Sequence, residues 1–558
     1  MLLVLGALLV PVALAAPAPA PVSAGGPFTF YVAATGNDDN PGTFDSPWRT
    51  IQRAASTVSA GSVVYVRGGV YNEAVTFAVS GSAEAGATRF ESFPGETAIV
   101  DGTGLEVPDG PSALFLIVDR SYLVVRGFEL RNYSTAERNI VPAGVLILGA
   151  SHHVEVSANH IHDIETRFPG AEGGDAHGIA VYGTSANESA RDILIVGNEL
   201  HDLKLGSSEA IAINGNVERF TVADNVVHDV NNIAIDCIGF EGTCPDPDVD
   251  QARDGFVINN TVYNVDSFGN PAYGEDRSAG GIYVDGGRDI LVERNTVHHA
   301  NIGIELASEH RGRATSGVTV RSNLVYRNDV TGISIGGYDK RRGSTENCAI
   351  INNTVVDNDT LETGTGEISL QFDTRNNTIR NSIILAGAQG KLIGNEFKKN
   401  RGNVVDSNLY AAPAGADVTW QWRRKTYRTL DAYRAATGND AGSALADPRL
   451  DENLRLLADS PAIDAGAAID AGPFDIDGEP RVQGTAIDIG ADEAVVSEAW
   501  RRTIHRYESV DLVIGPATTA LRARPAPATR ARSPYAAAAR GEPCRRTPLE
   551  NCADVPRR

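Results

Sequence analysis

The sequence predicts an all-β solenoid, a chain wound into stacked coils, over most of its 558 residues. One short phrase recurs: alternating apolar residues, then Asn, then two or three residues ending in His or Tyr. Such alternation is the pattern of a β-strand. Its asparagines are 27 to 39 residues apart, the period of a solenoid coil. The clearest copies are VEVSANHIH (154–162), ILIVGNELH (193–201), FTVADNVVH (220–228), FVINNTVY (256–263), ILVERNTVH (290–298) and VTVRSNLVY (318–326).

The recurring asparagines predict a fixed corner of each coil. Asn tolerates tight turns, so asparagines at one corner can stack as a hydrogen-bonded ladder. This pattern resembles the right-handed parallel β-helix, the fold of many pectate lyases and other polysaccharide-processing enzymes. The resemblance implies a fold and no chemistry. The asparagines are residues 159, 198, 225, 260, 295, 323, 353, 381 and 408.

The chain begins with an apolar run at residues 2–15, LLVLGALLVPVALA. The run is too short to span a bilayer, and it predicts a signal peptide over residues 1–15 with cleavage near Ala15. Residues 16–27 then form a Pro/Ala linker. We therefore expect a secreted, extracellular protein without a membrane span.

Residues 28–120 are predicted to form an N-terminal cap and the first coils. Pro47 opens a predicted short helix that runs to about Val58, with Ser46 as its N-cap. A helix here can cover the open end of the solenoid core. The stretch 30–77 is similar to the N-terminal cap of family 9 pectate lyases and their uncharacterised relatives.

The β-helix repeats are predicted over residues 121–411, and terminal coils with an inserted helix over 412–495. Asp-rich turns such as DIDGEPR (475–481) suggest calcium, but tight turns recruit Asp in any case, and we favour the turn interpretation. Residues 496–558 are rich in Ala, Pro and Arg and predict a largely disordered tail.

Composition restricts the partners. The formal charge of −22 argues against nucleic acid and disfavours a polyanionic substrate unless metal ions screen the charge. We expect a monomer. Of five cysteines, Cys237 with Cys244 and Cys544 with Cys552 are close enough in sequence for disulfides, and Cys348 is expected to be buried.

One column of outward side chains is the predicted catalytic site. Aligning the inward aliphatic residues of the second strand in each coil places Asp236, Asp285 and Glu305 at the same outward position in three consecutive coils. Stacked coils are about 4.8 Å apart, so carboxylates in one column repel each other. A structural column favours Asn, Ser or Thr, so these acids are candidates for catalysis.

Two chemistries suit these three carboxylates. In glycoside hydrolysis they supply the acid, base or nucleophile. Two neighbouring carboxyl groups repel each other, which raises the pKa of one of them and makes it an acid beside a base. Alternatively they bind calcium, and the resemblance to pectate lyases implies β-elimination with a Lys or Arg as base. Hydrolysis is slightly favoured, because carboxylates outnumber candidate bases. A non-catalytic extracellular carbohydrate-binding protein is a third alternative. The candidate bases, all in loops, are Lys204, Arg277, Arg311 and Lys340.

The loops beside this column supply predicted substrate-binding residues. Aromatic side chains next to carboxylates suit sugar rings, so we expect a polysaccharide or oligosaccharide partner. Histidines at the coil corners are interpreted instead as a structural stack. The predicted substrate-binding residues are His177, Glu209, Glu241, Tyr273, Glu309, His310, Arg311, Tyr338 and Lys340.

Overall fold

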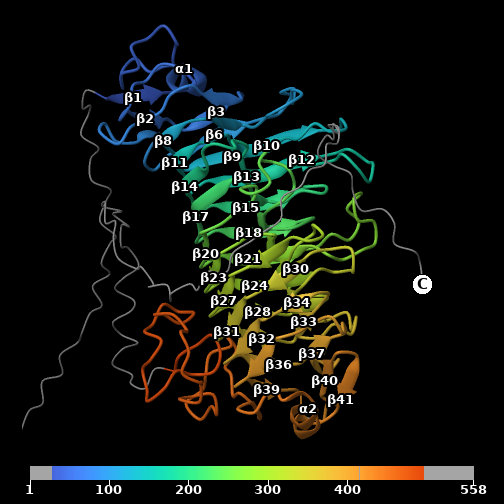
Figure 1. Cartoon of the computed structure of the whole chain (residues 1–558). Coiled ribbons are helices and arrows are strands. Elements are labelled where there is room, and N and C mark those ends of the chain that lie inside the picture. Colours follow the sequence, from blue (N-terminus) through green and yellow to red (C-terminus); the bar gives the residue numbers. More distant parts are fainter. Residues whose placement is uncertain (1–27, 414, 495–558) are drawn as a thin grey trace, which may run out of the picture.

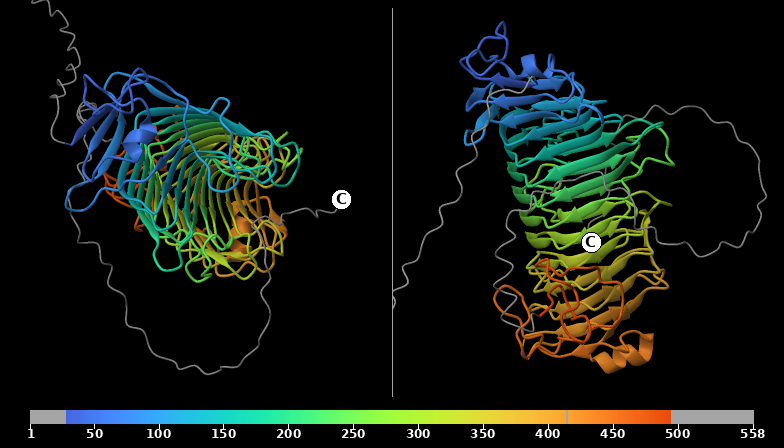
Figure 2. Two further views of the ribbon diagram at one scale, coloured as in Figure 1. Left: turned by 90° about the horizontal axis from the view of Figure 1, so that it is seen from above. Right: turned by 90° about the vertical axis from the view of Figure 1, so that its left-hand side faces the viewer.

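The computed structural model describes residues 28–413 and 415–494, which wind into a right-handed parallel β-helix (Figure 1). The predicted fold class is therefore confirmed. Three long sheets, A, B and C, run the length of the solenoid, and a view along its axis superimposes the coils (Figure 2). The predicted signal peptide, linker, tail and Cys544–Cys552 pair lie outside the described residues.

Sheet A precedes the asparagine corner of each coil. Its central strands point Val156, Ile195 and Val222 into a core where they are fully buried. Its thirteen parallel strands are, in order, β1 (Thr29–Val32), β2 (Val63–Val66), β5 (Thr88–Ser92), β8 (Ser121–Arg126), β11 (His152–Ser157), β14 (Ala190–Val196), β17 (Val217–Ala223), β20 (Phe256–Ile258), β23 (Leu291–Glu293), β27 (Thr319–Arg321), β31 (Ala349–Ile351), β35 (Thr378–Arg380) and β38 (Val404–Asp406).

Sheet B follows that corner and is also entirely parallel. Its strands are β3 (Gly69–Tyr71), β6 (Ala98–Asp101), β9 (Phe128–Thr135), β12 (His160–Thr166), β15 (Glu199–Leu203), β18 (Val226–Val230), β21 (Thr261–Val265), β24 (Thr296–Ala300), β28 (Leu324–Tyr326), β32 (Thr354–Val356), β36 (Ile383–Leu385), β39 (Leu409–Ala411) and β42 (Ala444–Leu445).

Sheet C completes each coil and carries the residues of interest. Only its last pair, β40 with β41, is antiparallel. Three short strands that follow β25, β29 and β33 in the sequence form a further parallel sheet: β26 (Ala314–Ser316), β30 (Ser344–Glu346) and β34 (Thr374–Arg375). The strands of sheet C are β4 (Val75–Phe77), β7 (Phe115–Val118), β10 (Ala143–Leu148), β13 (His177–Gly183), β16 (Ile211–Gly215), β19 (Ile235–Ile238), β22 (Gly280–Asp285), β25 (Ile302–Ala307), β29 (Thr331–Ile335), β33 (Ile368–Leu370), β37 (Lys391–Asn395), β40 (Thr419–Trp422) and β41 (Lys425–Tyr427).

The asparagine ladder is confirmed, with one correction. Asn159 donates from its backbone N–H and its Nδ2 to Asn198 Oδ1, both at 3.0 Å, and Asn198 donates likewise to Asn225 Oδ1 at 2.9 Å. The pattern continues to Asn353, but there Ser382 takes the next rung in place of the predicted Asn381. Asn381 has φ 51° and turns its amide to the carbonyl of Ala467.

The corner histidines form the predicted structural stack on the outside of sheet B. Successive rings lie nearly parallel, with centroids 4.7 to 5.3 Å apart. Three of them also hydrogen-bond the Asp that follows in sequence, for example His201 Nδ1 to Asp202 Oδ2 at 2.7 Å. The stack consists of His162, His201, His228, Tyr263, His298 and Tyr326.

The N-terminal helix α1 (Ile51–Ala55) covers the first coil but is shorter than predicted. Its N-cap is Thr50, not Ser46, and Pro47 precedes the helix. The reason is tertiary: Trp48 forms a bridge to Val32 in sheet A, so the chain is still extended there. The carboxylate of Glu73 then accepts the free N–H groups of Ile51 and Gln52.

The inserted helix is α2 (Leu430–Thr437), inside the predicted stretch, and Gly438 ends it with φ 74°. Tyr433 of α2 stacks on Trp420, 6.1 Å between ring centroids, at the C-terminal end of the core. After β42 the chain packs back against the outside of the solenoid, where Leu456 and Ile489 contact Ile383. Neither described helix is long or apolar enough to cross a bilayer.

The Asp-rich turns after β42 hold backbone N–H groups, as the turn interpretation expects, but Asp475, Asp477 and Asp492 also bring carboxylate oxygens within 4.8 Å of one another, so the calcium alternative stays open. Asp475 Oδ1 accepts the N–H groups of Asp477 and Glu479, and Arg455 pairs with Asp477 at 2.5 Å. Cys237 and Cys244 are free thiols, so the suggested bridge between them is not formed, and Cys348 is buried as expected.

Candidate functional site

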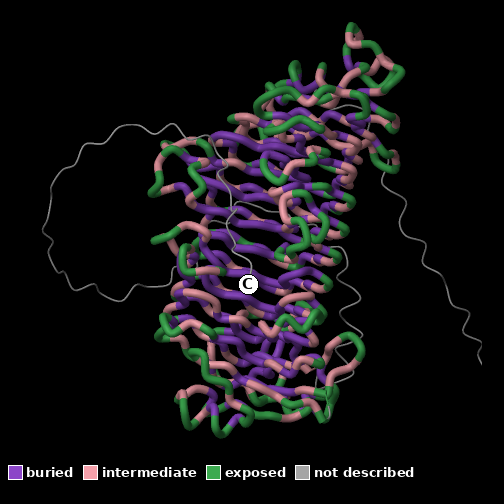
Figure 3. Tube along the Cα trace, turned by 90° about the vertical axis from the view of Figure 1, so that its right-hand side faces the viewer, coloured by how far each residue is buried: buried purple, intermediate pink, exposed green. Residues whose placement is uncertain are grey.

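The outward face of sheet C carries acids where the other coils carry small or apolar residues. Going from coil to coil, one column reads Ala180, Ala212, Asp236, Tyr283 and Glu305, followed by two serines. Buried residues run along these strands and exposed residues gather in the loops on either side (Figure 3). We call this face of sheet C the floor, and the loops at the beginning and at the end of its strands the two walls.

The predicted single column of three acids is wrong in register. Asp236 and Glu305 share the column with Tyr283, but Asp285 pairs with Ala307, two residues further along the strand. In β19 the alignment by sequence paired Ile233 with Ile211, but the structure pairs Ile235 with it. In β25 the alignment paired Ile302 with Ile282, but the structure pairs Ile304 with it. Alternating isoleucines offer two equivalent alignments, and a shift by two residues keeps the inward and outward faces unchanged.

The corrected register changes the spacing of the carboxyl groups. Asp285 lies one coil and two residues from both Glu305 and Asp236, which is about 8 Å between backbones. Asp236 and Glu305 are two coils apart, or about 10 Å. The arrangement is a staggered trio and not a stack at about 5 Å.

Each of the three acids is almost fully buried and has few hydrogen-bond donors. Asp285 Oδ1 accepts the backbone N–H of Glu309 at 2.7 Å. Glu305 Oε1 is 3.5 Å from Gln371 Nε2, and Asp236 Oδ1 has no partner among the described residues. No cation forms a salt bridge with any of the three in the described part of the chain.

Burial and mutual repulsion hold protons in this cluster at neutral pH. Burial, followed by the negative charge of Glu309, raises the pKa of Glu305 to about 8. Burial, followed by Glu309 and Glu241, raises the pKa of Asp285, while the Glu309 N–H opposes that shift. The pKa of Asp236 is raised by burial and then by Glu209 and Asp285. The three carboxyl groups therefore compete for ionisation, because the charge of one raises the pKa of its neighbours.

The wall at the beginning of the strands contains His177 and Glu209. His177 donates from Nδ1 to the carbonyl of Glu209 at 3.0 Å, and Tyr182 donates its hydroxyl to His177 Nε2 at 2.7 Å. Burial lowers the pKa of His177 to about 4, so the ring is neutral. Both ring nitrogens are occupied, so His177 orients Tyr182. The predicted Tyr273 lies on this wall and accepts from Asn232 at 3.3 Å.

The wall at the end of the strands contains the other predicted binding residues. Glu241 accepts from Asn214 at 2.9 Å, and Glu309 Oε2 lies 3.6 Å from Arg342 Nη1. Arg342 also stacks on the exposed ring of Tyr338, 4.3 Å from its centroid. Arg342 was not among the residues predicted from the sequence, although Tyr338 and Lys340 of the same loop were.

The candidate bases are divided between the two walls. Lys204 pairs with Glu165 at 2.8 Å, and Arg277 pairs with Asp266 and stacks on Phe268. Neither reaches the floor. Arg311 and Lys340 line a cavity in the wall at the strand ends.

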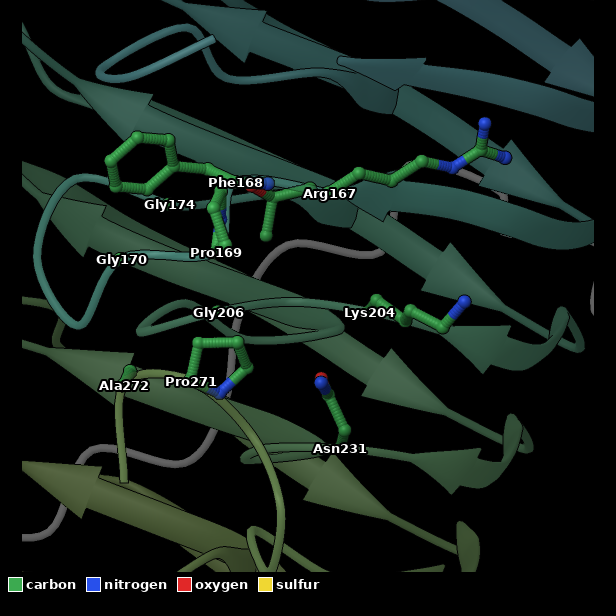
Figure 4. A pocket seen from close by; sticks show the side chains of 11 residues that line it. Arg167, Phe168, Pro169, Gly170, Gly174, Lys204, Gly206, Asn231, Pro271 and Ala272 are labelled. Carbon is green, nitrogen blue, oxygen red and sulfur yellow. The ribbon is translucent and has the colours of Figure 1, made fainter. Parts of the chain in front are cut away.

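A second cavity of about 330 Å³ opens at the strand-start wall (Figure 4). Phe168, Pro169 and Pro271 supply apolar surfaces, and Lys204 and Asn231 supply polar groups. Apolar faces beside a few hydrogen-bonding groups are suited to sugar rings.

The donor set for a metal is different from the predicted one. In the described part of the chain, the ligand atoms that converge near the floor belong to Glu241, Asp285 and His310, all within 4.8 Å of one another. Asp236 and Glu305 are not in this group. Calcium prefers oxygen ligands only, so a set with one imidazole suits a borderline metal such as zinc better.

Comparisons with known proteins give a consistent classification. A family model described as "Pel9A-like, right handed beta helix region" matches residues 30–190, and one described as "Right handed beta helix region" matches 143–355 and 254–421. "Uncharacterized protein YwoF" of Bacillus subtilis (strain 168) is 43% identical over 436 residues, covering 77% of this chain and 91% of that protein.

The other similar proteins match less closely. "Pectate lyase PEL9" of Emericella nidulans is 33% identical over 141 residues, 25% of this chain and 32% of that protein. The solved complex of XylC with xylose is 12% identical, with a TM-score of 0.48 over 83% of this chain and 98% of that one. Pectate lyase Pel9A is 14% identical, with a TM-score of 0.44 over 83% and 96%. At these identities the likeness to the solved structures concerns the fold only.

Proposed function

Because the chain belongs to the right-handed β-helix family, we propose that the acidic floor of sheet C hydrolyses glycosidic bonds in a polysaccharide. Its predicted signal peptide would export it to where such polymers occur. The observation that carries the proposal is the diagonal pair of Asp285 and Glu305, two buried carboxyl groups that form no salt bridge within residues 28–413 and 415–494. Two buried carboxyl groups without a cation destabilise the folded state, and groups with such raised pKa values cluster at functional sites.

The two carboxyl groups have different environments, which supports different roles. Glu305 retains its proton at neutral pH, because its pKa is raised to about 8, so it can protonate the leaving oxygen. Burial raises the pKa of Asp285 as well, and the N–H that it accepts from Glu309 opposes that shift without cancelling it. We assign Asp285 the role of the base that takes a proton from water, because this backbone donor favours its ionised form and Glu305 accepts no backbone N–H from the described residues. The water oxygen bonds to the anomeric carbon as the glycosidic C–O bond breaks. Asp236 stands beside Asp285 as a further acid.

The spacing favours inversion at the anomeric carbon. Inverting glycosidases keep about 6.5–9.5 Å between their carboxyl groups, which leaves room for a water, whereas retaining enzymes keep about 5–5.5 Å. Outward side chains on neighbouring strands run roughly parallel, so the diagonal backbone spacing of about 8 Å falls in the inverting range.

A metal-dependent lyase is the second candidate. The convergence of Glu241, Asp285 and His310 favours it, because a cation there could neutralise an acidic sugar. On that alternative Asp285 would be a ligand and not a base.

The test is digestion of a glycan panel by the wild type and by Glu305→Gln, Asp285→Asn and Glu293→Gln. Glu293 is equally buried but pairs with Arg321 at 2.6 Å on sheet A, so it is a matched control. Each reaction is run with and without EDTA, and reducing ends and ultraviolet absorbance are measured together.

Hydrolysis predicts new reducing ends without absorbance, no effect of EDTA, and losses of roughly 10²- to 10⁴-fold for the two floor variants only. Absorbance from a new double bond with EDTA sensitivity would select the lyase. Full activity of both floor variants would refute the site.

A further inference from the structure

A cationic cavity lies next to the acidic floor, at the ends of strands β25, β29 and β33. It has a volume of about 330 Å³. Five basic side chains line it against only two carboxylates, in a chain whose net charge is −22. The basic residues are Arg311, Lys340, Arg342, Arg375 and Lys399.

The two carboxylates of the cavity are already used. Arg375 pairs with Glu346 at 2.7 Å and with Asp373 at 2.6 Å, and Lys399 also pairs with Asp373. Arg311 and Lys340 are exposed and form no salt bridge with any carboxylate in the described part of the chain. The cavity therefore has uncompensated positive charge.

The backbone holds this cavity in place. The loops that carry Arg311 and Lys340 are joined by hydrogen bonds from Gly343 N to Ser308 O at 2.7 Å and from Ser344 N to Arg313 O at 3.0 Å. The parallel strands β26, β30 and β34 continue from these loops. Cations on hydrogen-bonded strands lose little entropy when they bind a ligand.

Glu309 connects the cavity to the proposed reaction centre. Arg342 lies 3.6 Å from the carboxylate of Glu309, and the N–H of Glu309 donates to Asp285. A sugar bound across Asp285 and Glu305 would therefore have its neighbouring unit close to this cavity.

We propose that this cavity is an anion subsite that binds a carboxylate, sulfate or phosphate substituent of the sugar unit next to the cleaved bond. The substrate is then an acidic polysaccharide. This proposal deepens the proposed function and relies on it for the position of the bond. Guanidinium groups match the planar oxygens of such anions, and the lysine adds a point charge. The negative net charge of the chain does not oppose binding, because the local field around the cavity is positive.

The test measures binding separately from cleavage. The inactive Glu305→Gln protein is titrated calorimetrically at low salt with trigalacturonate, a chondroitin sulfate hexasaccharide, glucose 6-phosphate and neutral maltohexaose. The same titrations are repeated after adding Arg311→Gln and Lys340→Gln. The control carries Arg288→Gln and Arg327→Gln instead, which remove the same charge from arginines paired with Asp289 and Asp357.

We expect at least one anionic probe to bind, and the cavity variant to bind it roughly tenfold more weakly or worse, with a smaller dependence on salt. The control should bind as the parent does, and the probe that binds identifies the anion. Equal affinity in parent and cavity variant, or no binding of any anionic probe, would overturn the proposal.

The two proposals can fail independently. If the wild type cleaves only neutral glycans and the cavity variant has an unchanged KM, the anion subsite is wrong and the hydrolytic site stands. If anionic probes bind through the cavity but no glycan is cleaved, the subsite stands and the catalytic proposal fails.

Discussion

Replacing Glu305 by glutamine should make the protein more stable at neutral pH while reducing its activity. The folded pKa of Glu305, about 8, lies above its ordinary value of 4.5. The folded state therefore binds the extra proton between these values, and stability falls as the pH rises through this window. Glutamine is neutral at every pH and avoids that loss.

The magnitude follows from the same two values. Keeping Glu305 in the fold costs roughly 3 kcal/mol at pH 7, and close to nothing at pH 4. A chain with this many ordered residues gains about 1 °C in Tm per kcal/mol, because its unfolding entropy is large. We expect Glu305→Gln to raise the Tm by up to about 3 °C at pH 7 and to leave it unchanged at pH 4.

Differential scanning calorimetry at both pH values measures this, with Glu293→Gln as the control. Glu293 has similar burial but pairs with Arg321, so the same substitution leaves that arginine unpaired and should lower the Tm at pH 7. If Glu305→Gln lowers the Tm at pH 7 as much as the control does, then Glu305 is a satisfied structural carboxylate and the reasoning about the floor is wrong.

Three further outcomes test other parts of the structure. Asn225→Ala removes a ladder rung that accepts two hydrogen bonds from Asn198, and should cost about 3–5 kcal/mol in urea unfolding; a cost below about 1 kcal/mol would contradict the ladder's role. Tyr182→Phe leaves His177 Nε2 buried and unpaired, so a loss of about 1–3 kcal/mol is expected, and an unchanged Tm would argue against that hydrogen bond. Gly343→Ala would place a Cβ 2.4 Å from a backbone carbonyl of the neighbouring loop, and should weaken anion binding with an unchanged far-ultraviolet circular dichroism spectrum; normal binding would refute the tight packing of the two loops.

Local rules predicted most of the fold because each coil repeats the same physical problem. Residues such as Asn225 and His201 recur at one corner, and their side chains bond or stack only with the equivalent residue one coil away. The repeat in the sequence therefore predicts which residues contact each other in successive coils. The end of the ladder was less clear, because Asn381 and Ser382 are adjacent and both are suited to a turn.

Features that depend on one specific long-range contact were not predictable. The helix α1 begins at Ile51 because Trp48, one residue after the predicted helix start at Pro47, is held in sheet A by Val32. The N–H groups at its start are then satisfied by Glu73, which comes from another part of the cap. Nothing local to the helix indicates either contact.

The alternation of apolar and polar residues was enough to predict that acids gather on one face of a parallel β-helix, since it assigns Asp236, Asp285 and Glu305 to the outside. Their register could be read only from the folded coils, because the alternating isoleucines fit two alignments equally well and the path of the chain between strands selects one of them. The same holds for the cationic cavity: Arg311 and Arg375 are 64 positions apart, and stacking of successive coils brings them together.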